Sequence, residues 1–184
     1  MKRKTVILIF LIAMLFTTFT TRPAVKPVMA QAPEFKLGNE MLLERYLYLL
    51  EGKRVGLITN QSGVNSKGQS LIDILAAQKS FTLTALYAPE HGIDGQAKAG
   101  EYVESTVHPA LGIPVCSLYG ATRKPTAAML SNVDVLLFDL QDIGARSYTY
   151  ISTMNYAMQA AKENGKLFIV LDRPNPLGGK IVDG

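Results

Sequence analysis

Cysteine and histidine are both scarce in this chain of 184 residues, and their scarcity argues against two kinds of site. The single cysteine, Cys116, lies in the apolar run from Ile113 to Leu118, where a small buried side chain is expected and a nucleophile is not. One cysteine also excludes an internal disulfide framework. The two histidines are His91 and His108, and Glu90-His91 is not the H-E-x-x-H pattern of a zinc-binding helix, so the sequence predicts no metal site.

Three further sequence motifs are missing. The turn after the first predicted strand reads Asn60-Gln61-Ser62-Gly63, where a dinucleotide-binding protein carries G-x-G-x-x-G. No phosphate-binding P-loop occurs, and neither does the G-x-S-x-G of the serine hydrolases. The sequence therefore predicts no nucleotide and no other cofactor.

The first 30 residues have the pattern of a secretory signal. Lys2, Arg3 and Lys4 precede an apolar run from Val6 to about Phe16, and residues 28–30 (VMA) supply the small residues that a signal peptidase recognises. The apolar run is shorter than the roughly 20 residues of a membrane-spanning helix, so a cleaved signal is favoured over a retained anchor. We expect cleavage after residue 30, a secreted or envelope location, and contact with the membrane only through the signal.

Removal of this signal changes the charge of the protein. The full chain carries a net charge of +4, and residues 1–30 hold five of its positive charges and no acidic residue, so the mature chain is at −1. No basic stripe with interleaved aromatic residues remains in it. The sequence therefore predicts no nucleic-acid partner.

After a linker that begins at residue 31, Asn39 is expected to cap a helix from Glu40 to Leu50, and Gly52 to end it. From residue 52 to residue 184, short apolar runs alternate with helical segments. The predicted strands are 54–59, 81–87, 114–118, 133–140 and 167–171, the predicted helices are 70–78, 125–130 and 149–164, and a long loop covers 89–112. Strands separated by helices predict an α/β fold, with a Rossmann-like parallel sheet flanked by helices in three layers.

Polar side chains follow four of these predicted strands. Because the carboxyl ends of parallel strands meet at one edge of the sheet, and ligands bind there in open α/β sheets, these side chains form the candidate site. They are Asn60, Glu90, His91, Asp139, Gln141, Asp142, Arg146, Tyr148, Asp172, Arg173 and Asn175. Each one also has an ordinary structural explanation, such as a turn, a helix cap or an ion pair between Arg173 and Asp172 or Asp142.

The chemistry of this set suits a polyhydroxylated ligand. Planar carboxylates, amides and an arginine donate and accept hydrogen bonds in fixed geometry, and a tyrosine ring can cover the apolar face of a sugar. The sequence therefore favours a saccharide as the ligand.

Several long motifs carry a resemblance to a known family. They are YAPEHG (87–92), SLYG (117–120), TRKP (122–125), FDLQDIGARSYTY (138–150) and LDRPNPLGG (171–179). Together, from about residue 52 to the last residue, they resemble the exo-β-N-acetylmuramidases of bacterial cell-wall recycling. The resemblance implies a glycoside hydrolase that removes terminal N-acetylmuramic acid from the non-reducing end of peptidoglycan fragments.

In that family the cleft lies between a Rossmann-like domain and a second, carboxyl-terminal domain, and the resemblance to this chain covers only the first. A catalytically silent module of the same fold that binds cell-wall sugars is therefore kept as the alternative to the enzyme.

The resemblance implies that Glu90 is the general acid. Such an acid must be protonated at the working pH, so we expect an apolar or anionic neighbourhood that raises the pKa of Glu90. Tyr87, Ala88 and either Asp139 or Asp142 are the residues expected to provide it. His91 is expected to orient Glu90 or to contact the sugar.

The second catalytic role is left open between Asp139, Asp142 and Asp172. Because N-acetylmuramic acid carries an acetamido group, a substrate-assisted reaction with an aspartate orienting the amide is ranked first. Arg146 or Arg173 is expected to pair with the lactyl carboxylate that separates muramic acid from N-acetylglucosamine.

Overall fold

The computed structural model describes residues 35–181, so the predicted signal sequence lies outside the described residues. Its helices are α2 (Gly38–Arg45), the 3-10 helix η1 (Leu47–Leu49), α3 (Leu71–Ala76) and α4 (Tyr150–Glu163), and its strands are β1 (Arg54–Thr59), β2 (Thr82–Ala88), β3 (Thr106–Val107), β4 (Pro114–Ser117), β5 (Val135–Asp139) and β6 (Leu167–Val170). None of the helices in this range combines the length and apolar character needed to cross a bilayer.

The strands form one sheet in the order β3-β4-β2-β1-β5-β6. Five of them are parallel, and numbered along the chain they stand in the order 3-2-1-4-5, which is the Rossmann arrangement. β3 is the exception, because it pairs antiparallel with β4 at the edge. The prediction of a Rossmann-like α/β fold is confirmed.

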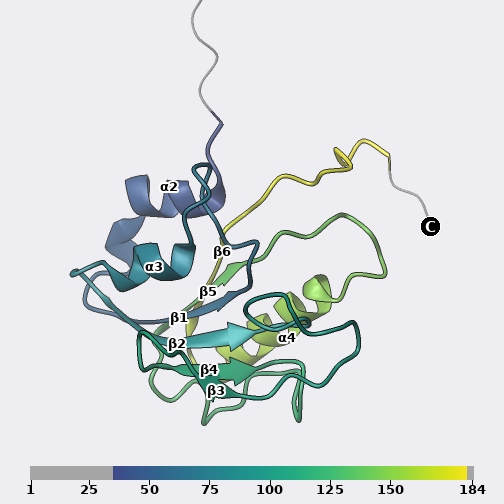
Figure 1. Cartoon of the computed structure of the whole chain (residues 1–184). Helices are drawn as coiled ribbons and strands as arrows, with labels where there is room; N and C mark the ends of the chain where they lie inside the picture. The colour runs from purple at the N-terminus through teal and green to yellow at the C-terminus, as the bar shows by residue number, and fades with distance from the viewer. Residues whose placement is uncertain (1–34, 182–184) are drawn as a thin grey trace, which may run out of the picture. The chain divides into compact units, whose positions relative to one another are not determined.

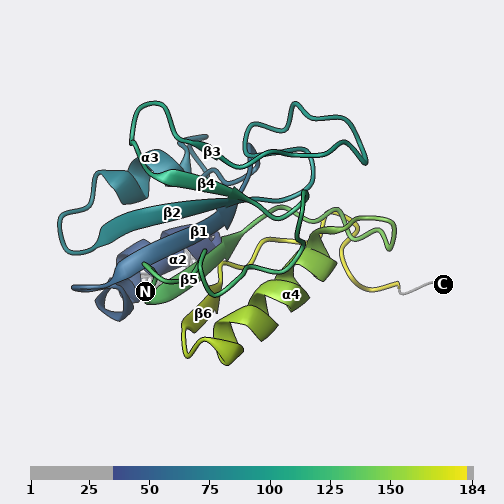
Figure 2. The same ribbon diagram turned by 90° about the horizontal axis from the view of Figure 1, so that it is seen from below.

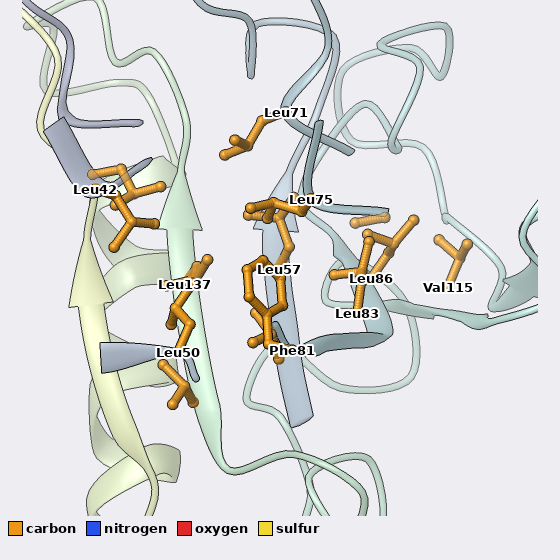
Figure 3. Close-up of a cluster of buried hydrophobic side chains, with 14 residues drawn as sticks. Leu42, Leu50, Leu57, Leu71, Leu75, Phe81, Leu83, Leu86, Val115 and Leu137 are labelled. Atoms are coloured by element: carbon orange, nitrogen blue, oxygen red, sulfur yellow. The ribbon is translucent and has the colours of Figure 1, made fainter. Parts of the chain in front are cut away.

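Helices cover both faces of this sheet, which gives the three layers expected from the sequence (Figures 1 and 2). Because successive side chains of a strand point to opposite faces, Leu137 packs in the core under α2 and α3, whereas Leu136 packs under α4. The first of these cores joins Leu42 of α2 and Leu75 of α3 to Leu57 of β1 (Figure 3). Both faces of β5 are thus buried, as its continuous apolar sequence predicts.

Four local predictions were wrong. The helix predicted to run to Leu50 stops at Arg45, and after Tyr46 the chain continues as η1. Asn39 does not cap that helix but lies inside it, 1% exposed. The helix predicted over 125–130 is a turn, and the loop predicted over 89–112 contains β3.

Candidate active site

The candidate site lies where the order of the parallel strands reverses, between β1 and β5. α3 follows β1 on one face of the sheet and α4 follows β5 on the other, so the two connections diverge (Figures 1 and 2). In open α/β sheets such a divergence forms a crevice outside the strand ends. Asn60 and Gln141 follow these two strands. Asn60 Oδ1 accepts hydrogen bonds from the amide and the hydroxyl of Ser62 at 2.9 and 2.6 Å, and Ser62 Oγ accepts one from the Gln141 amide at 3.0 Å. Asn60 therefore holds the two loops together, and its carbonyl oxygen is already occupied.

Glu90 lies two residues beyond β2, next to this crevice, and is 9% exposed. Its Oε1 accepts a hydrogen bond from the Gly100 amide at 2.9 Å, and its Oε2 accepts one from the Thr149 hydroxyl at 2.6 Å. The carboxylate is one wall of a pocket of about 180 Å³ that is lined by Glu90, His91, Ala99, Ser147, Tyr148, Thr149 and Tyr150. Two loops and the start of α4 thus enclose one carboxylate.

The surroundings of Glu90 stabilise its ionised form. Burial acts to raise the pKa of Glu90, but hydrogen bonds from Thr149, Gly100 and Tyr119, together with His91, outweigh burial and leave the pKa below its ordinary value. This corrects the expected direction of the shift. The cause is that the neighbours of the carboxylate are hydrogen-bond donors and a histidine, which together stabilise its charge more than burial destabilises it.

His91 has a strained backbone next to Glu90. Its φ is 71°, a left-handed conformation that residues other than glycine rarely adopt. Its Nδ1 lies 2.8 Å from the carbonyl oxygen of Ala97, which requires a proton on Nδ1. Within residues 35–181 its ring makes no hydrogen bond to Glu90, so of the two expected roles the geometry favours contact with a ligand, through Nε2.

Tyr148, two residues before α4, and Tyr150, the first residue of α4, form one wall of the pocket. Their rings meet edge to face, with centroids 5.3 Å apart, and the Tyr150 hydroxyl accepts a hydrogen bond from Asn60 Nδ2 at 2.9 Å. Burial raises the pKa of Tyr150, and Tyr148, Glu90 and Asp142 add to the rise while the hydrogen bond from Asn60 opposes it. The hydroxyl therefore keeps its proton and can donate a hydrogen bond to a ligand. The candidate residues chosen from the sequence included Tyr148 and omitted Tyr150, although both tyrosines stand in the same motif, SYTY (147–150).

Asp139 and Arg173 are not available to a ligand in the way the sequence suggested. Arg173 Nε and Nη2 donate to the two carboxylate oxygens of Asp139 at 2.6 and 3.0 Å, and their side chains are 6% and 0% exposed. Asn39 Nδ2 adds a third hydrogen bond to Asp139 at 3.2 Å. This pair joins β5, the loop after β6 and α2, so both side chains have a structural role, and the catalytic role expected of Asp139 and the binding role expected of Arg173 stay predictions. The sequence also gave Arg173 the wrong partner.

A second pocket, of about 150 Å³, lies on the β6 side of the crevice. The candidate residues Asp142, Asp172, Arg173 and Asn175 line it. Asp142 Oδ1 accepts a hydrogen bond from the Gly144 amide at 2.7 Å, and Asn175 Oδ1 accepts one from the Leu177 amide at 2.9 Å. These carboxylate and amide groups therefore shape their own loops as well as facing the pocket.

The two remaining candidates differ in how firmly they are held. Gln141 Nε2 donates to the carbonyl oxygens of Asp142 and Pro174 at 2.7 and 3.0 Å, so it fastens the loop after β5 to the loop after β6. Arg146 is exposed and, within residues 35–181, forms no ion pair. In the same range no three side chains of histidine, cysteine, aspartate or glutamate lie close enough to hold a metal ion.

The fold and the site define a class of protein: an α/β domain with a Rossmann-like sheet and a carboxylate in a pocket outside the strand ends. Residues 55–184 match the family model described as "Exo-beta-N-acetylmuramidase NamZ, N-terminal", and the chain belongs to this family. It is 51% identical over 185 residues to the peptidoglycan beta-N-acetylmuramidase NamZ of Bacillus subtilis (strain 168). That alignment covers 99% of this chain and 45% of the relative, so the chain spans less than half of the length of that relative.

Two crystal structures of DUF1343 family proteins from Bacteroides fragilis share the fold. One is 54% identical with a TM-score of 0.74, and the match covers 81% of this chain and 37% of the other. The second is 33% identical with a TM-score of 0.63, and the match covers 77% of this chain and 35% of the other. In both comparisons the match covers little more than a third of a longer chain.

Proposed function

We propose that this chain carries the catalytic carboxylate of an exo-acting glycoside hydrolase, which releases terminal N-acetylmuramic acid from the non-reducing end of peptidoglycan fragments. Family membership and the name of the Bacillus subtilis relative support a muramidase. The observation that carries the proposal is the position of Glu90, nearly buried at the strand ends and facing a pocket walled by two tyrosines. The predicted signal sequence supports an envelope or extracellular location, where peptidoglycan fragments occur.

In the proposed reaction Glu90 acts as the general acid. A sugar seated over the pocket removes the remaining water from Glu90, and this further burial raises the pKa of the carboxyl group toward the value that an acid needs. The proton of Glu90 passes to the glycosidic oxygen as the bond to the anomeric carbon breaks. The acetamido oxygen of the sugar bonds to that carbon. Water then attacks the same carbon and breaks its bond to the acetamido oxygen, while Glu90, now a carboxylate, takes a proton from the water.

Asp142 and Asp172 are the aspartates that remain eligible to orient the acetamido group, because Asp139 is occupied by Arg173. Of the two we propose Asp142, since its charge contributes to the raised pKa of Tyr150 on the wall of the Glu90 pocket. The Tyr150 hydroxyl is proposed to donate a hydrogen bond to an oxygen of the sugar.

The test uses a disaccharide of N-acetylmuramic acid linked to N-acetylglucosamine, with free N-acetylmuramic acid as the measured product. Glu90→Gln keeps the shape of the side chain and removes the acid, so we expect turnover to fall by about 100-fold or more while the sugar still binds. Glu104→Gln is the matched control, because Glu104 is an exposed carboxylate in the same loop and lines none of the pockets described here. Equal turnover in the wild type and Glu90→Gln contradicts the assignment.

One finding favours the alternative, a sugar-binding module without activity: hydrogen bonds from Thr149 and Gly100 help to hold the pKa of Glu90 below its ordinary value in the unliganded protein. The same experiment separates the two functions. Binding of the disaccharide by the wild-type chain without any release of N-acetylmuramic acid would identify a binding module.

A further inference from the structure

A third pocket lies behind the wall of the Glu90 pocket. It has a volume of about 190 Å³ and is lined by Leu118, Tyr119, Arg123, Thr149, Ser152, Thr153 and Tyr156. The two pockets are neighbours, because Thr149 lines both of them and Tyr119 contributes to the lowered pKa of Glu90. Arg123 belongs to the TRKP motif, which the proposed reaction leaves without a role.

The guanidinium of Arg123 is positioned but not neutralised. Its Cζ lies over the Tyr119 ring, 3.9 Å from the ring centroid, which is a cation–π contact. Within residues 35–181 it forms no ion pair, and the neighbouring lysine, Lys124, is paired with Glu163 instead. A guanidinium without an acidic partner can bind a carboxylate through two parallel hydrogen bonds.

The rest of the pocket is compatible with an anion. Ser152, Thr153 and Tyr156 contribute hydroxyl groups and no carboxylate. Ser152 and Thr153 lie in the first turn of the 14-residue helix α4, where the helix dipole favours negative charge. The Glu90 carboxylate next door is already held by its own donors from Gly100 and Thr149.

We propose that Arg123 binds a carboxylate of the bound saccharide and thereby selects the substrate. The inference rests on the proposed function and adds to it the residue that distinguishes muramic acid from N-acetylglucosamine, two sugars that differ by a lactyl ether with a free carboxylate. We assign this role to Arg123 rather than to Arg173, whose Nε and Nη2 already donate to Asp139, or to Arg146, which lines neither the Glu90 pocket nor the third pocket. The carboxylate has two possible sources, the lactyl group and an attached stem peptide.

Binding tests this proposal without requiring turnover. We would measure the affinity of the full chain for N-acetylmuramic acid and for N-acetylglucosamine by NMR titration or calorimetry, for the wild type, Arg123→Gln and Arg146→Gln. We expect the wild type to prefer N-acetylmuramic acid and Arg123→Gln to lose about ten-fold in affinity for it, with no change for N-acetylglucosamine. Arg123→Lys should restore only part of the loss, because an ammonium cannot form the two parallel hydrogen bonds.

The outcomes separate the two sources and the two proposals. A muramyl peptide has its lactyl carboxylate in an amide bond and a free carboxylate on the peptide. If Arg123→Gln weakens binding of free N-acetylmuramic acid, the lactyl group is the source, and if it weakens only the muramyl peptide, the stem is. An Arg123→Gln variant that binds both N-acetylmuramic acid and the muramyl peptide as tightly as the wild type does, or a loss confined to Arg146→Gln, overturns the inference. Failure of the proposed function appears separately, as intact binding with no release of sugar.

Discussion

At the scale of single residues, the carboxylates at the ends of β2 and β5, the strands on either side of β1, have different roles because of their partners. Asp139 is fully buried against the guanidinium of Arg173, whereas Glu90 accepts its hydrogen bonds from an amide and a hydroxyl and still faces a pocket. A carboxylate that is paired and enclosed stabilises the fold, and one that is hydrogen-bonded but accessible can meet a substrate. The pairing partner therefore separates the structural residue from the catalytic candidate.

The first prediction concerns the Asp139–Arg173 pair. Asp139→Ala leaves the Arg173 guanidinium buried without its counter-ion, so we expect the free energy of unfolding to fall by about 3–5 kcal/mol. Asp172→Ala is the control, because its side chain is exposed and the expected change is within about 0.5 kcal/mol. Urea unfolding followed by circular dichroism measures both. If Asp139→Ala is as stable as the wild type but inactive, Asp139 is catalytic and the structural assignment is wrong.

The second prediction concerns the pH dependence that Glu90 gives to activity. A general acid works only when protonated, so activity falls as the pH rises through its pKa, and kcat/KM reports the pKa of the free enzyme. Thr149→Val removes a donor that stabilises the ionised form, so the pKa of Glu90 rises and the alkaline limb of kcat/KM moves to higher pH.

The matched control for this shift is Thr82→Val, the same substitution at the start of β2, the end of the strand opposite Glu90. If the alkaline limb of kcat/KM stays in place in Thr149→Val, or moves to lower pH, a group other than Glu90 governs the pH profile. The limb of kcat, which reports the complex, should lie above that of kcat/KM in the wild type, since the bound sugar buries Glu90 further.

The candidate residues could be found from the sequence, but their roles depended on contacts that it does not reveal. Polar groups after apolar strands mark the rim of a parallel sheet, and this placed Glu90, Asp142 and Tyr148 near one another. Asp139 follows the same pattern, yet its partners Arg173 and Asn39 are 34 and 100 residues away in the chain. Tyr150 was missed because the hydrogen bond from Asn60 that positions it spans 90 residues.

At the scale of elements, the strands that were predicted well are those whose burial leaves a clear pattern. β1 matches its predicted bounds because its apolar residues are enclosed on both faces. β3 has two exposed residues and pairs only with β4, so no periodicity marks it. The segment 125–130 contains apolar residues although it ends in a turn and not in a helix. Leu130, the last residue of that segment, is buried, and the Tyr87 hydroxyl donates a hydrogen bond to the carbonyl oxygen of Met129 at 2.8 Å.

The third prediction tests how two loops of the rim fit together. Gly144 has a φ of 75°, and a Cβ there would collide with the side chain of Asn175 in the loop after β6. Gly68 has a φ of 74° and no atom within 4 Å of its Cβ position, so Gly68→Ala carries the backbone strain alone. We expect Gly144→Ala to cost about 1 kcal/mol more than Gly68→Ala in urea unfolding, because Asn175 must release the Leu177 amide. Equal costs would mean that the contact between the loops contributes nothing to stability.

At the scale of the whole molecule, the charge of the protein depends on where the working chain begins. Residues 1–30 carry the entire positive excess, and without them the net charge is −1. A near-neutral chain is consistent with a saccharide ligand that is recognised by local hydrogen bonds and single arginines. A chain at −1 would give no long-range attraction to nucleic acid, and the high isoelectric point of the full chain would then have no bearing on the ligand.

The last prediction concerns this amino-terminal segment. If residues 1–30 are a cleaved signal, then the protein recovered from the medium or the envelope of expressing bacteria begins at Gln31, and removal of residues 2–30 keeps it in the cytoplasm. Amino-terminal sequencing and fractionation of the cells measure both. Replacing Ala30 by a bulky residue, as in Ala30→Trp, should leave uncleaved precursor at the membrane, because the peptidase accepts only small side chains there. Export of an intact chain that stays in the membrane fraction would identify a retained anchor, and an unexported wild type would place the muramidase activity proposed here inside the cell.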